Sequence, residues 1–207
     1  MDQQEGRPAL GFIADDQALD FLNSIAAPRG TEFDWLSDGN DLLIWLCESG
    51  LITNEEVNAL NKSAKRTELD ETAAKARKLR EWFRTFVHIH LGKSINKGVL
   101  AKLEPLNKIL AQDNSFPQIT VGQSGKLELS RQQHFNSPDM LLVPIAEAMG
   151  TLVTNVDFKN VKNCEGPTCS MLFHDISKNR KRRWCSMAVC GNRAKAAAHR
   201  ARKKPEN

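Results

Sequence analysis

Four cysteines near the C-terminal end constrain this chain more than any other feature. They stand as Cys164-x4-Cys169 and, after fifteen further residues, as Cys185-x4-Cys190. A tetrahedral Zn²⁺ takes four soft ligands, and two short-spaced pairs can each supply two of them from a tight turn. Because the same spacing occurs in both pairs, the pattern predicts a closed tetrathiolate site that holds one structural zinc ion per chain.

Disulfides and an iron–sulfur cluster are the alternative interpretations of these cysteines. The first twelve residues are acidic and polar and lack the basic-then-apolar profile of a signal peptide. No apolar stretch reaches the ~20 residues that span a bilayer. We therefore expect a cytoplasmic protein without membrane segments, in which thiols stay reduced and paired cysteines indicate metal. Four thiolates can also hold an iron–sulfur cluster, and His174 or His199 could replace one cysteine ligand.

The charge of the chain is concentrated around these cysteines. Residues 161–207 hold twelve Lys or Arg against three acidic residues, whereas the remainder holds seventeen against twenty-two. The segment is therefore strongly cationic, and the rest of the chain is slightly acidic. A cationic zinc module at the end of a neutral-to-acidic body is typical of proteins that bind a polyanion.

The first 160 residues are predicted to be mostly helical. Thr53 and Glu56 form a capping box, in which hydroxyl and carboxylate each cover the other's free backbone N–H group. Alternation of apolar and polar residues on both sides of Gly122 to Gly125 predicts one hairpin. The sequence thus indicates a mainly α fold with a small β-hairpin (α+β). The expected helices begin at Asp15-Asp16 and reach Ile25, cover 41–49, run from Thr53 to about Ala64, cover 68–91, run through 100–110 with a kink near Pro105, and start at Ser137-Pro138 and reach Val156.

A second basic element follows the last cysteine. Gly191 suits a bend before a helix, and the alanine-rich segment from Asn192 onward has strong helix propensity. At 100° per residue this helix places its basic side chains along one ridge and its alanines on a neighbouring strip. We expect the alanine strip to pack against the zinc module. The ridge comprises Arg193, Arg200 and Lys204, and the strip comprises Ala194, Ala197, Ala198 and Ala201.

The residues around the cysteines resemble a known family. Cys-x4-Cys, then a basic segment ending in Arg-Arg-Trp-Cys-Ser-Met, then Cys-Gly-Asn-Arg-Ala-Lys, is similar to the bacterial CGNR zinc finger over residues 164–204. Leu-Asp-Phe-Leu-Asn-Ser at 19–24, followed by Arg-Gly and Asp-Leu-Leu-Ile-Trp-Leu, resembles the ABATE domain that precedes this finger. The resemblance implies a stress-induced transcriptional regulator. Its expected organisation is a helical sensor or assembly domain over 1–158, then a treble-clef-like zinc finger over 159–207 that ends in a basic helix.

Double-stranded DNA is the expected partner of the finger. The basic loop would neutralise phosphates, and the helix could enter the major groove, where Arg193 suits guanine and Asn192 suits adenine. Asn192 could instead cap its helix, and Trp184 is expected to pack on the finger rather than stack on a base. A module that binds nucleic acid without sequence preference, an RNA-binding module and a protein-interaction finger remain alternatives. The candidate DNA-binding residues are Arg180, Lys181, Arg182, Arg183, Asn192, Arg193, Lys195, Arg200 and Lys204.

The function of the body is less constrained by its residues. Asn23, Arg29 and Asp34, near the family-like segment, are candidate polar residues of a pocket for a small-molecule effector. A homodimer is expected because regulators commonly read paired half-sites, although no heptad pattern is visible. No phosphate-binding glycine loop, nucleophile elbow or His-Glu-x-x-His motif occurs, and a zinc ion with four protein ligands has no open position for water. We therefore expect a protein that is not an enzyme.

Overall fold

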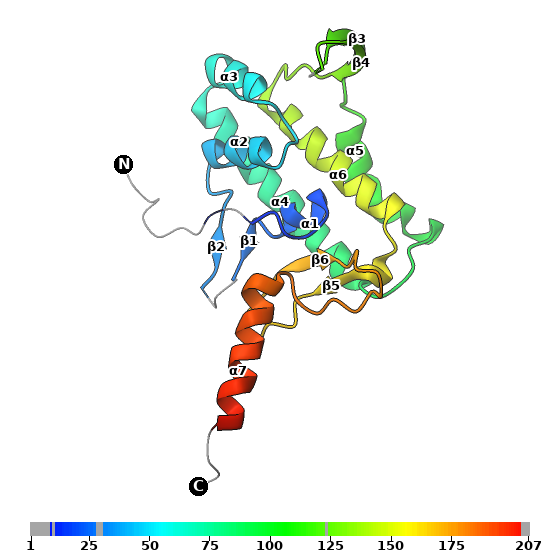
Figure 1. Cartoon of the computed structure of the whole chain (residues 1–207). Coiled ribbons are helices and arrows are strands. Elements are labelled where there is room, and N and C mark those ends of the chain that lie inside the picture. Colours follow the sequence, from blue (N-terminus) through cyan, green and yellow to red (C-terminus); the bar gives the residue numbers. More distant parts are fainter. Residues whose placement is uncertain (1–8, 10, 28–30, 123, 204–207) are drawn as a thin grey trace.

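A computed structural model describes residues 9, 11–27, 31–122 and 124–203, and Figure 1 shows how its helices and short strands are arranged. Helices make up most of the body, and the only sheets among the described residues are three antiparallel strand pairs. The elements are α1 (Gln17–Leu22), β1 (Ile25–Ala26), β2 (Phe33–Asp34), α2 (Gly39–Glu48), α3 (Asn54–Ser63), α4 (Arg66–His90), the 3-10 helix η1 (Lys97–Leu103), α5 (Glu104–Leu110), β3 (Phe116–Val121), β4 (Leu127–Gln132), the 3-10 helix η2 (Pro138–Leu141), α6 (Leu142–Asn155), the 3-10 helix η3 (Phe158–Asn160), β5 (Val161–Asn163), β6 (Leu172–His174), the π-helical turn η4 (Met187–Gly191) and α7 (Asn192–Lys203).

Local capping signals position several of the helices. The Thr53 side chain accepts the Glu56 backbone N–H, while the Glu56 carboxylate accepts that of Thr53, so the predicted capping box opens α3. Asp38 caps α2, which begins at Gly39, two residues ahead of the expected start. Gly92, with φ of +71°, follows α4 and adopts a backbone conformation that other residues rarely take.

Helix α1 lies at the centre of the molecule and is shorter than predicted. It ends at Leu22, and Ile25 belongs to β1, where it pairs with Asp34 of β2. The backbone N–H and the hydroxyl of Ser24 both donate to the Phe21 carbonyl, which closes the last turn. Five of the six residues of α1 are buried, because the helix packs against α4, α6 and β6.

The expected helix over 100–110 is divided into two elements. Residues 97–103 form η1, and Pro105 stands in the first turn of α5. Proline lacks a backbone N–H, so it suits the first turn of a helix, where that group has no intrahelical partner. Pro105 therefore marks a helix start and not a kink. In the same way Ser137 and Pro138 open the 3-10 turn η2, and α6 follows it from Leu142.

The apolar stripe of η2 and α6 belongs to a core that continues into the C-terminal segment. Leu141, Ile145, Met149 and Leu152 are each completely buried, as the helical spacing predicts. One continuous core cluster includes residues of α1, α2, α4 and α6, together with Phe158, the β5–β6 pair and three of the four clustered cysteines. Cys47 is only partly buried, and its Sγ lies 3.2 Å from the Asn54 side-chain oxygen.

Two elements project from this core. The β3–β4 hairpin, predicted from its alternating pattern, rises from one end of the body, and α7 extends from the opposite end (Figure 1). Among the described residues, no helix is both long and apolar enough to cross a membrane.

Candidate metal centre and nucleic-acid interface

Two short loops bring the four cysteines together. Cys164 directly follows β5 and Cys169 lies shortly before β6, so the antiparallel pairing of these strands places the first two ligands side by side. Cys185 ends the basic loop, and Cys190 lies in η4. The side chain of Ser186 accepts the backbone N–H of Val189, which fixes the start of that turn.

The sulfur positions match a tetrahedral metal ion. All four Sγ atoms lie within 4.8 Å of one another, and no other group of metal-binding side chains is found among the described residues. Cys185 Sγ is 3.8 Å from Cys169 Sγ and 3.7 Å from Cys190 Sγ. A zinc ion with Zn–S bonds of about 2.3 Å separates its ligand sulfurs by about 3.8 Å when the geometry is tetrahedral. The side chains of His174 and His199 are not part of this group.

The electrostatics of the cluster also fit a divalent cation. The hydrogen bond between the Cys169 and Cys185 sulfurs lowers the pKa of Cys169 to about 5 and raises the pKa of Cys185. Burial, followed by the charge of Cys169, raises the pKa of Cys190 to about 11. Four thiolates cannot all ionise in this volume unless a cation compensates them. The backbone N–H groups of Gly166 and Cys185 lie 3.5 and 3.4 Å from Cys164 Sγ and stabilise its charge.

The bend expected at Gly191 does not occur, and the space around this glycine is limited by two side chains. The helical turn begins at Met187 and continues directly into α7, so no bend separates the last ligand from the helix. A Cβ at Gly191 would lie 2.6 Å from Met187 Sδ and 3.2 Å from Trp184 Cδ1. A larger residue would therefore require the Met187 side chain to move. Asn192 lies inside this continuous helix, not at its cap, and its amide donates to the Ala188 carbonyl at 3.2 Å.

The finger is bound to the body through a buried side chain. The amide of Asn23 donates to the Leu172 carbonyl at 2.8 Å, and its oxygen accepts the Leu172 backbone N–H at 2.9 Å. The His174 backbone N–H donates to the Ala14 carbonyl at 2.8 Å. Asn23 therefore extends the edge of β6 as a neighbouring strand would, and it joins segments 149 residues apart. No pattern in the residues around Asn23 indicates this role.

Asp175 organises the basic loop from inside. Its carboxylate is completely buried, and it accepts the Lys162 ammonium at 2.6 Å and the backbone N–H groups of Ser177 and Arg182 at 3.0 Å. Burial alone would raise the pKa of Asp175, but the Lys162 ammonium and the N–H donors hold it well below its usual range. The loop is consequently tied around one ionised carboxylate, which sequence reasoning missed.

The four adjacent cations of the loop have different surroundings. The Arg182 guanidinium points toward the body, where it pairs with Asp15, donates to the Ile13 carbonyl at 3.1 Å and lies 4.5 Å from the centre of the Phe173 ring. Arg183 is exposed, pairs with Glu165 at 2.6 Å and lies over the half-buried Trp184 ring. Arg180 is exposed and donates to the Asp175 carbonyl, while Lys181 is exposed at the outer side of the loop.

Helix α7 leaves the body with its side chains in solvent. Ala197, Ala198 and Ala201 are exposed, so the prediction that an alanine strip packs on the zinc module is wrong. The helix axis points away from the body (Figure 1), and only the first turn, including the partly buried Arg193 and Ala194, remains beside η4. Lys195 and Arg200 are exposed on it, as is Asn192, whereas Lys204 lies outside the described residues.

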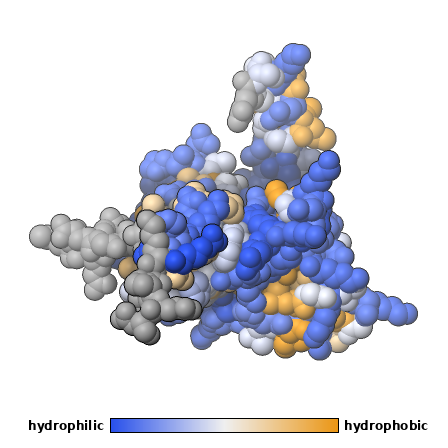
Figure 2. All heavy atoms as spheres, turned by 60° about the horizontal axis from the view of Figure 1, so that its bottom comes forward, coloured by the Kyte–Doolittle hydropathy of each residue, from blue (hydrophilic) through white to orange (hydrophobic). Residues whose placement is uncertain are grey.

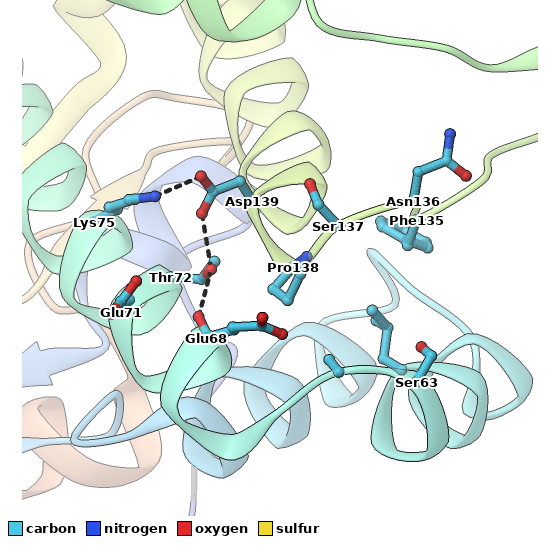
Figure 3. Close-up of a pocket in the computed structure, with 12 residues that line it drawn as sticks. Ser63, Glu68, Glu71, Thr72, Lys75, Phe135, Asn136, Ser137, Pro138 and Asp139 are labelled. Carbon is cyan, nitrogen blue, oxygen red and sulfur yellow. Dashed lines mark hydrogen bonds and ion pairs between the residues drawn. The ribbon is translucent and has the colours of Figure 1, made fainter.

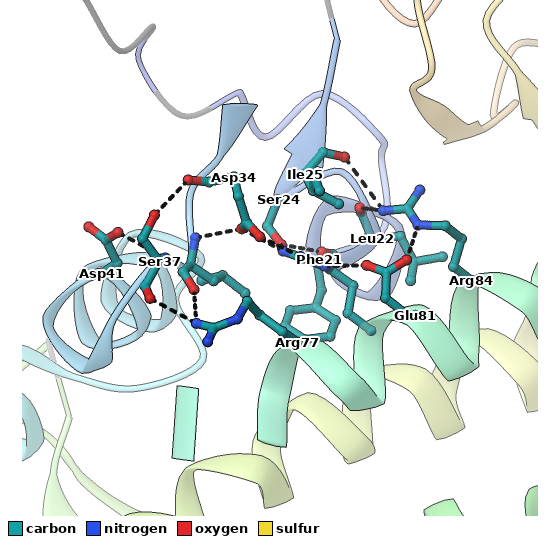
Figure 4. Close-up of polar contacts among 12 residues, drawn as sticks. Phe21, Leu22, Ser24, Ile25, Asp34, Ser37, Asp41, Arg77, Glu81 and Arg84 are labelled. Atoms are coloured by element: carbon teal, nitrogen blue, oxygen red, sulfur yellow. Dashed lines mark hydrogen bonds and ion pairs between the residues drawn. The ribbon is translucent and has the colours of Figure 1, made fainter. Parts of the chain in front are cut away.

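The polar residues proposed for a body pocket occupy different environments. Asn23 is engaged with Leu172 as described, and Arg29 lies outside the described residues. Asp34 forms a two-pronged ion pair with the buried Arg80, at 2.9 and 2.7 Å, in the network of Figure 4. Arg80 also donates to the Ser24 hydroxyl at 2.9 Å. Although burial raises it, the pKa of Asp34 is lowered overall by the Arg80 guanidinium.

Two cavities are relevant to ligand binding. The first, about 340 Å³, lies between α3, α4 and η2, and its polar wall is internally bonded, because Asp139 pairs with Lys75 and accepts from Thr72 (Figure 3). The second, about 220 Å³, lies between the body and the finger. Trp35, Trp45 and Phe12 line its body side, and the ligands Cys185 and Cys190 border it. Asn23 and Asp20 also line it, and burial raises the pKa of Asp20 to about 6.

Comparison with protein families agrees with both parts of this geometry. A family model described as "CGNR zinc finger" matches residues 160–203, which include all four cysteines and α7. A second model, ABATE, described as "Putative stress-induced transcription regulator", matches residues 15–156, more than half of the chain. The chain belongs to the ABATE family. The finger of this ABATE protein holds one structural zinc ion, bound by Cys164, Cys169, Cys185 and Cys190. No curated protein matches the chain.

Proposed function

We propose that this protein is a DNA-binding transcription regulator whose zinc finger presents α7 to the major groove. The observation that carries the proposal is the position of α7. The helix starts two residues after the zinc ligand Cys190, projects from the body and bears no acidic residue among its twelve residues. An α-helix fits the width of the major groove. The expected organisation into a helical body over 1–158 and a finger over 159–207 is part of this proposal.

The zinc ion would supply the folding energy of the finger and not a reaction step. Its four protein ligands leave no open position for water, which is characteristic of a structural site. Cys190 is followed after one residue by the start of α7, so binding of the metal fixes where the helix leaves the finger. Loss of the ion is therefore expected to abolish DNA binding together with the fold of the finger.

The candidate DNA-binding residues differ in how far their side chains are engaged within the protein. The exposed Lys195 and Arg200 contact DNA from α7, and Asn192 and Arg193 lie at its start. Lys204, which is also expected to contact DNA, lies outside the described residues. Arg180, Lys181 and Arg183 lie on the basic loop. They neutralise phosphates with the N–H donors that are not used in contacts within the protein. Arg182 is not included, because its guanidinium is engaged with Asp15, Phe173 and the Ile13 carbonyl.

Selection of bound sequences by the full-length, zinc-loaded protein tests this proposal. We expect an enriched motif, and we expect Lys195→Ala and Arg200→Ala each to reduce the slope of log affinity against log salt by about one. Lys108→Ala, which removes an exposed cation from α5, is the matched control and should leave the slope unchanged. Absence of DNA affinity at low salt would refute the proposal, and binding without an enriched motif would favour the non-specific alternative.

We further propose that the body senses an effector in the cavity between body and finger. A ligand there would contact Trp35 and Trp45 on one side and the residues around Cys185 and Val189 on the other. The affinity for this ligand would therefore depend on the position of the finger relative to the body. In a thermal-shift screen of metabolites, a true effector should raise the Tm of the wild type but not of Val189→Trp, which fills the cavity. An effector that stabilises both proteins equally binds elsewhere.

A further inference from the structure

Toward its tip, the β3–β4 hairpin has an aliphatic face that nothing in the described structure covers. The register pairs Ile119 with Leu129 and Val121 with Leu127. Directly paired residues point to the same side of a sheet, so these four side chains form a compact apolar face. They are 69–75% exposed, the highest values among the large hydrophobic residues of the described chain. Figure 2 shows hydrophobic residues gathered on one side of this projection.

The other face of the hairpin is polar, so the exposure is not a general property of the segment. Gln118 pairs with Ser130 and Thr120 with Glu128, and the hydroxyls of Thr120 and Ser130 lie 2.8 Å apart. Over residues 118–121 and 127–130 the strands therefore keep the alternation that a sheet has when one side is covered and the other is in water.

A two-stranded hairpin of this kind is only marginally stable in water on its own. Apart from each other, β3 and β4 make no more than sparse contacts with the other described elements. At the base, Arg131, on the same side as the aliphatic residues, pairs with Asp113, and Phe116 stacks on His134 at 5.0 Å. These contacts anchor the hairpin but leave the four aliphatic side chains uncovered. A partner that covers this face would bury the apolar side chains that the body leaves exposed.

We propose that the aliphatic face of the hairpin is the dimer interface of this protein, with the equivalent face of a second copy packed against it. The four aliphatic side chains carry no charge, and Arg131, which continues the same side at the base of the hairpin, is paired with Asp113. The face therefore complements an identical face better than it complements DNA or an acidic peptide. An interface between two like surfaces related by a twofold axis uses the same residues twice. The arrangement rests on the proposed function to the extent that a dimer of fingers would read two half-sites.

The size of the face sets the strength of the dimer. Four aliphatic side chains bury on the order of 400 Å² per copy, about half of the ~800 Å² per partner of a standard interface. The remainder must come from the flanking backbone and rim of the hairpin. We therefore expect a dimer that dissociates in the micromolar range, not an obligate one. Pro117, which lacks an N–H donor, interrupts the outer edge of β3, so packing of faces is favoured over edge pairing of that strand.

Sedimentation velocity of the full-length, zinc-loaded protein between about 1 and 100 µM tests the proposal. We expect a monomer–dimer equilibrium, and a dissociation constant at least tenfold higher for Leu129→Lys. Ser130→Lys adds the same charge one residue away on the polar face and should dimerise as the wild type does. Zinc content and far-UV circular dichroism establish that each variant is folded.

A wild type that remains monomeric at 100 µM overturns the proposal, as does a dimer that Leu129→Lys leaves intact. Association of the wild type with lipid vesicles, but not with itself, would assign the face to a membrane and would also overturn it. DNA binding separates the two proposals. If Leu129→Lys still binds a single half-site but loses cooperative binding to paired sites, both stand. If no variant binds DNA while the dimer behaves as expected, the interface stands and the proposed function fails.

Discussion

The side chain of Asn23 pairs with the backbone of Leu172 through both of its polar groups. The two hydrogen bonds, 2.8 and 2.9 Å long, are buried and connect the end of α1 with β6 of the zinc finger. The side chain substitutes for a neighbouring strand, since β6 pairs with β5 on only one edge. The finger is therefore attached to the body by a directional contact as well as by apolar packing.

Asn23→Ala should destabilise the protein by about 2–4 kcal/mol, because it leaves a buried N–H and a buried carbonyl of Leu172 without partners. Urea unfolding of the zinc-loaded protein measures the change. Asn61→Ala removes the same side chain from the exposed surface of α3 and should shift the free energy of unfolding by less than ~0.5 kcal/mol. Equal stability of the two variants would show that the Asn23 contact does not hold the finger.

Replacement of Arg182 by alanine should destabilise the protein more than replacement of its neighbour Arg183. Arg182 is half-buried and contacts Asp15, the Ile13 carbonyl and the Phe173 ring, so its removal should cost about 2–3 kcal/mol. The ion pair of Arg183 with Glu165 is largely exposed and is worth ~0–1 kcal/mol. Chemical denaturation of both variants gives the comparison. A larger loss for Arg183→Ala would contradict the assignment of Arg182 to the junction.

These two cases show where the sequence was informative and where it was not. The spacing of the cysteines and the Thr53–Glu56 capping box depend on residues close together in the chain, and both were predicted. Asn23 and Leu172 are 149 residues apart, and Arg182 and Asp15 are 167 apart. Four consecutive cations look alike in the sequence. Only the contacts of the Arg182 guanidinium with Asp15, the Ile13 carbonyl and the Phe173 ring distinguish it from its neighbours.

The ends of the helices also depend on contacts between segments that are far apart in the sequence. Helical spacing extended α1 to Ile25, but the chain turns at Ser24 because Ile25 pairs with Asp34 in the short β1–β2 ladder. On α7 the alanine spacing predicted a packed strip, yet no element of the described body reaches that side. Periodicity identifies which residues share a face, and it cannot identify whether anything covers that face.

The buried carboxyl of Asp20 should make stability depend on pH. Burial raises its pKa from 3.8 to about 6, although the Ala14 and Ile13 backbone N–H groups, both at 3.0 Å, oppose this. The folded state thus binds the proton more tightly than the unfolded state. The resulting stability is fully present below pH ~4 and is lost as the pH rises through about 6, so Asp20 contributes about 1 kcal/mol more at pH 5 than at pH 7.

Asp20→Asn isolates this effect, since the asparagine oxygen can accept the same two N–H groups and carries no charge. We expect the variant to be the more stable protein at pH 7, by up to ~3 kcal/mol, and its advantage to shrink at pH 5. Comparing wild type and variant at each pH cancels any change in zinc affinity that both share. An advantage that does not change between pH 5 and pH 7 would mean that Asp20 does not titrate in this range.

Two glycines without positive φ should tolerate alanine to different degrees. A Cβ at Gly39, in the first turn of α2, would lie 2.4 Å from Leu69 Cβ and 2.6 Å from the Leu69 carbonyl carbon. The backbone of α4 cannot make room unless the whole helix moves, and the Gly39 N–H would lose its 2.8 Å bond to Asp70.

At Gly191 the closest atoms belong to the thioether of Met187, a flexible side chain that is 51% exposed. Gly39→Ala should therefore cost about 3 kcal/mol or more, and Gly191→Ala less, as measured by thermal and urea unfolding. The reverse order would imply that the contact between Gly191, Met187 and Trp184 is more rigid than the crossing of α2 and α4.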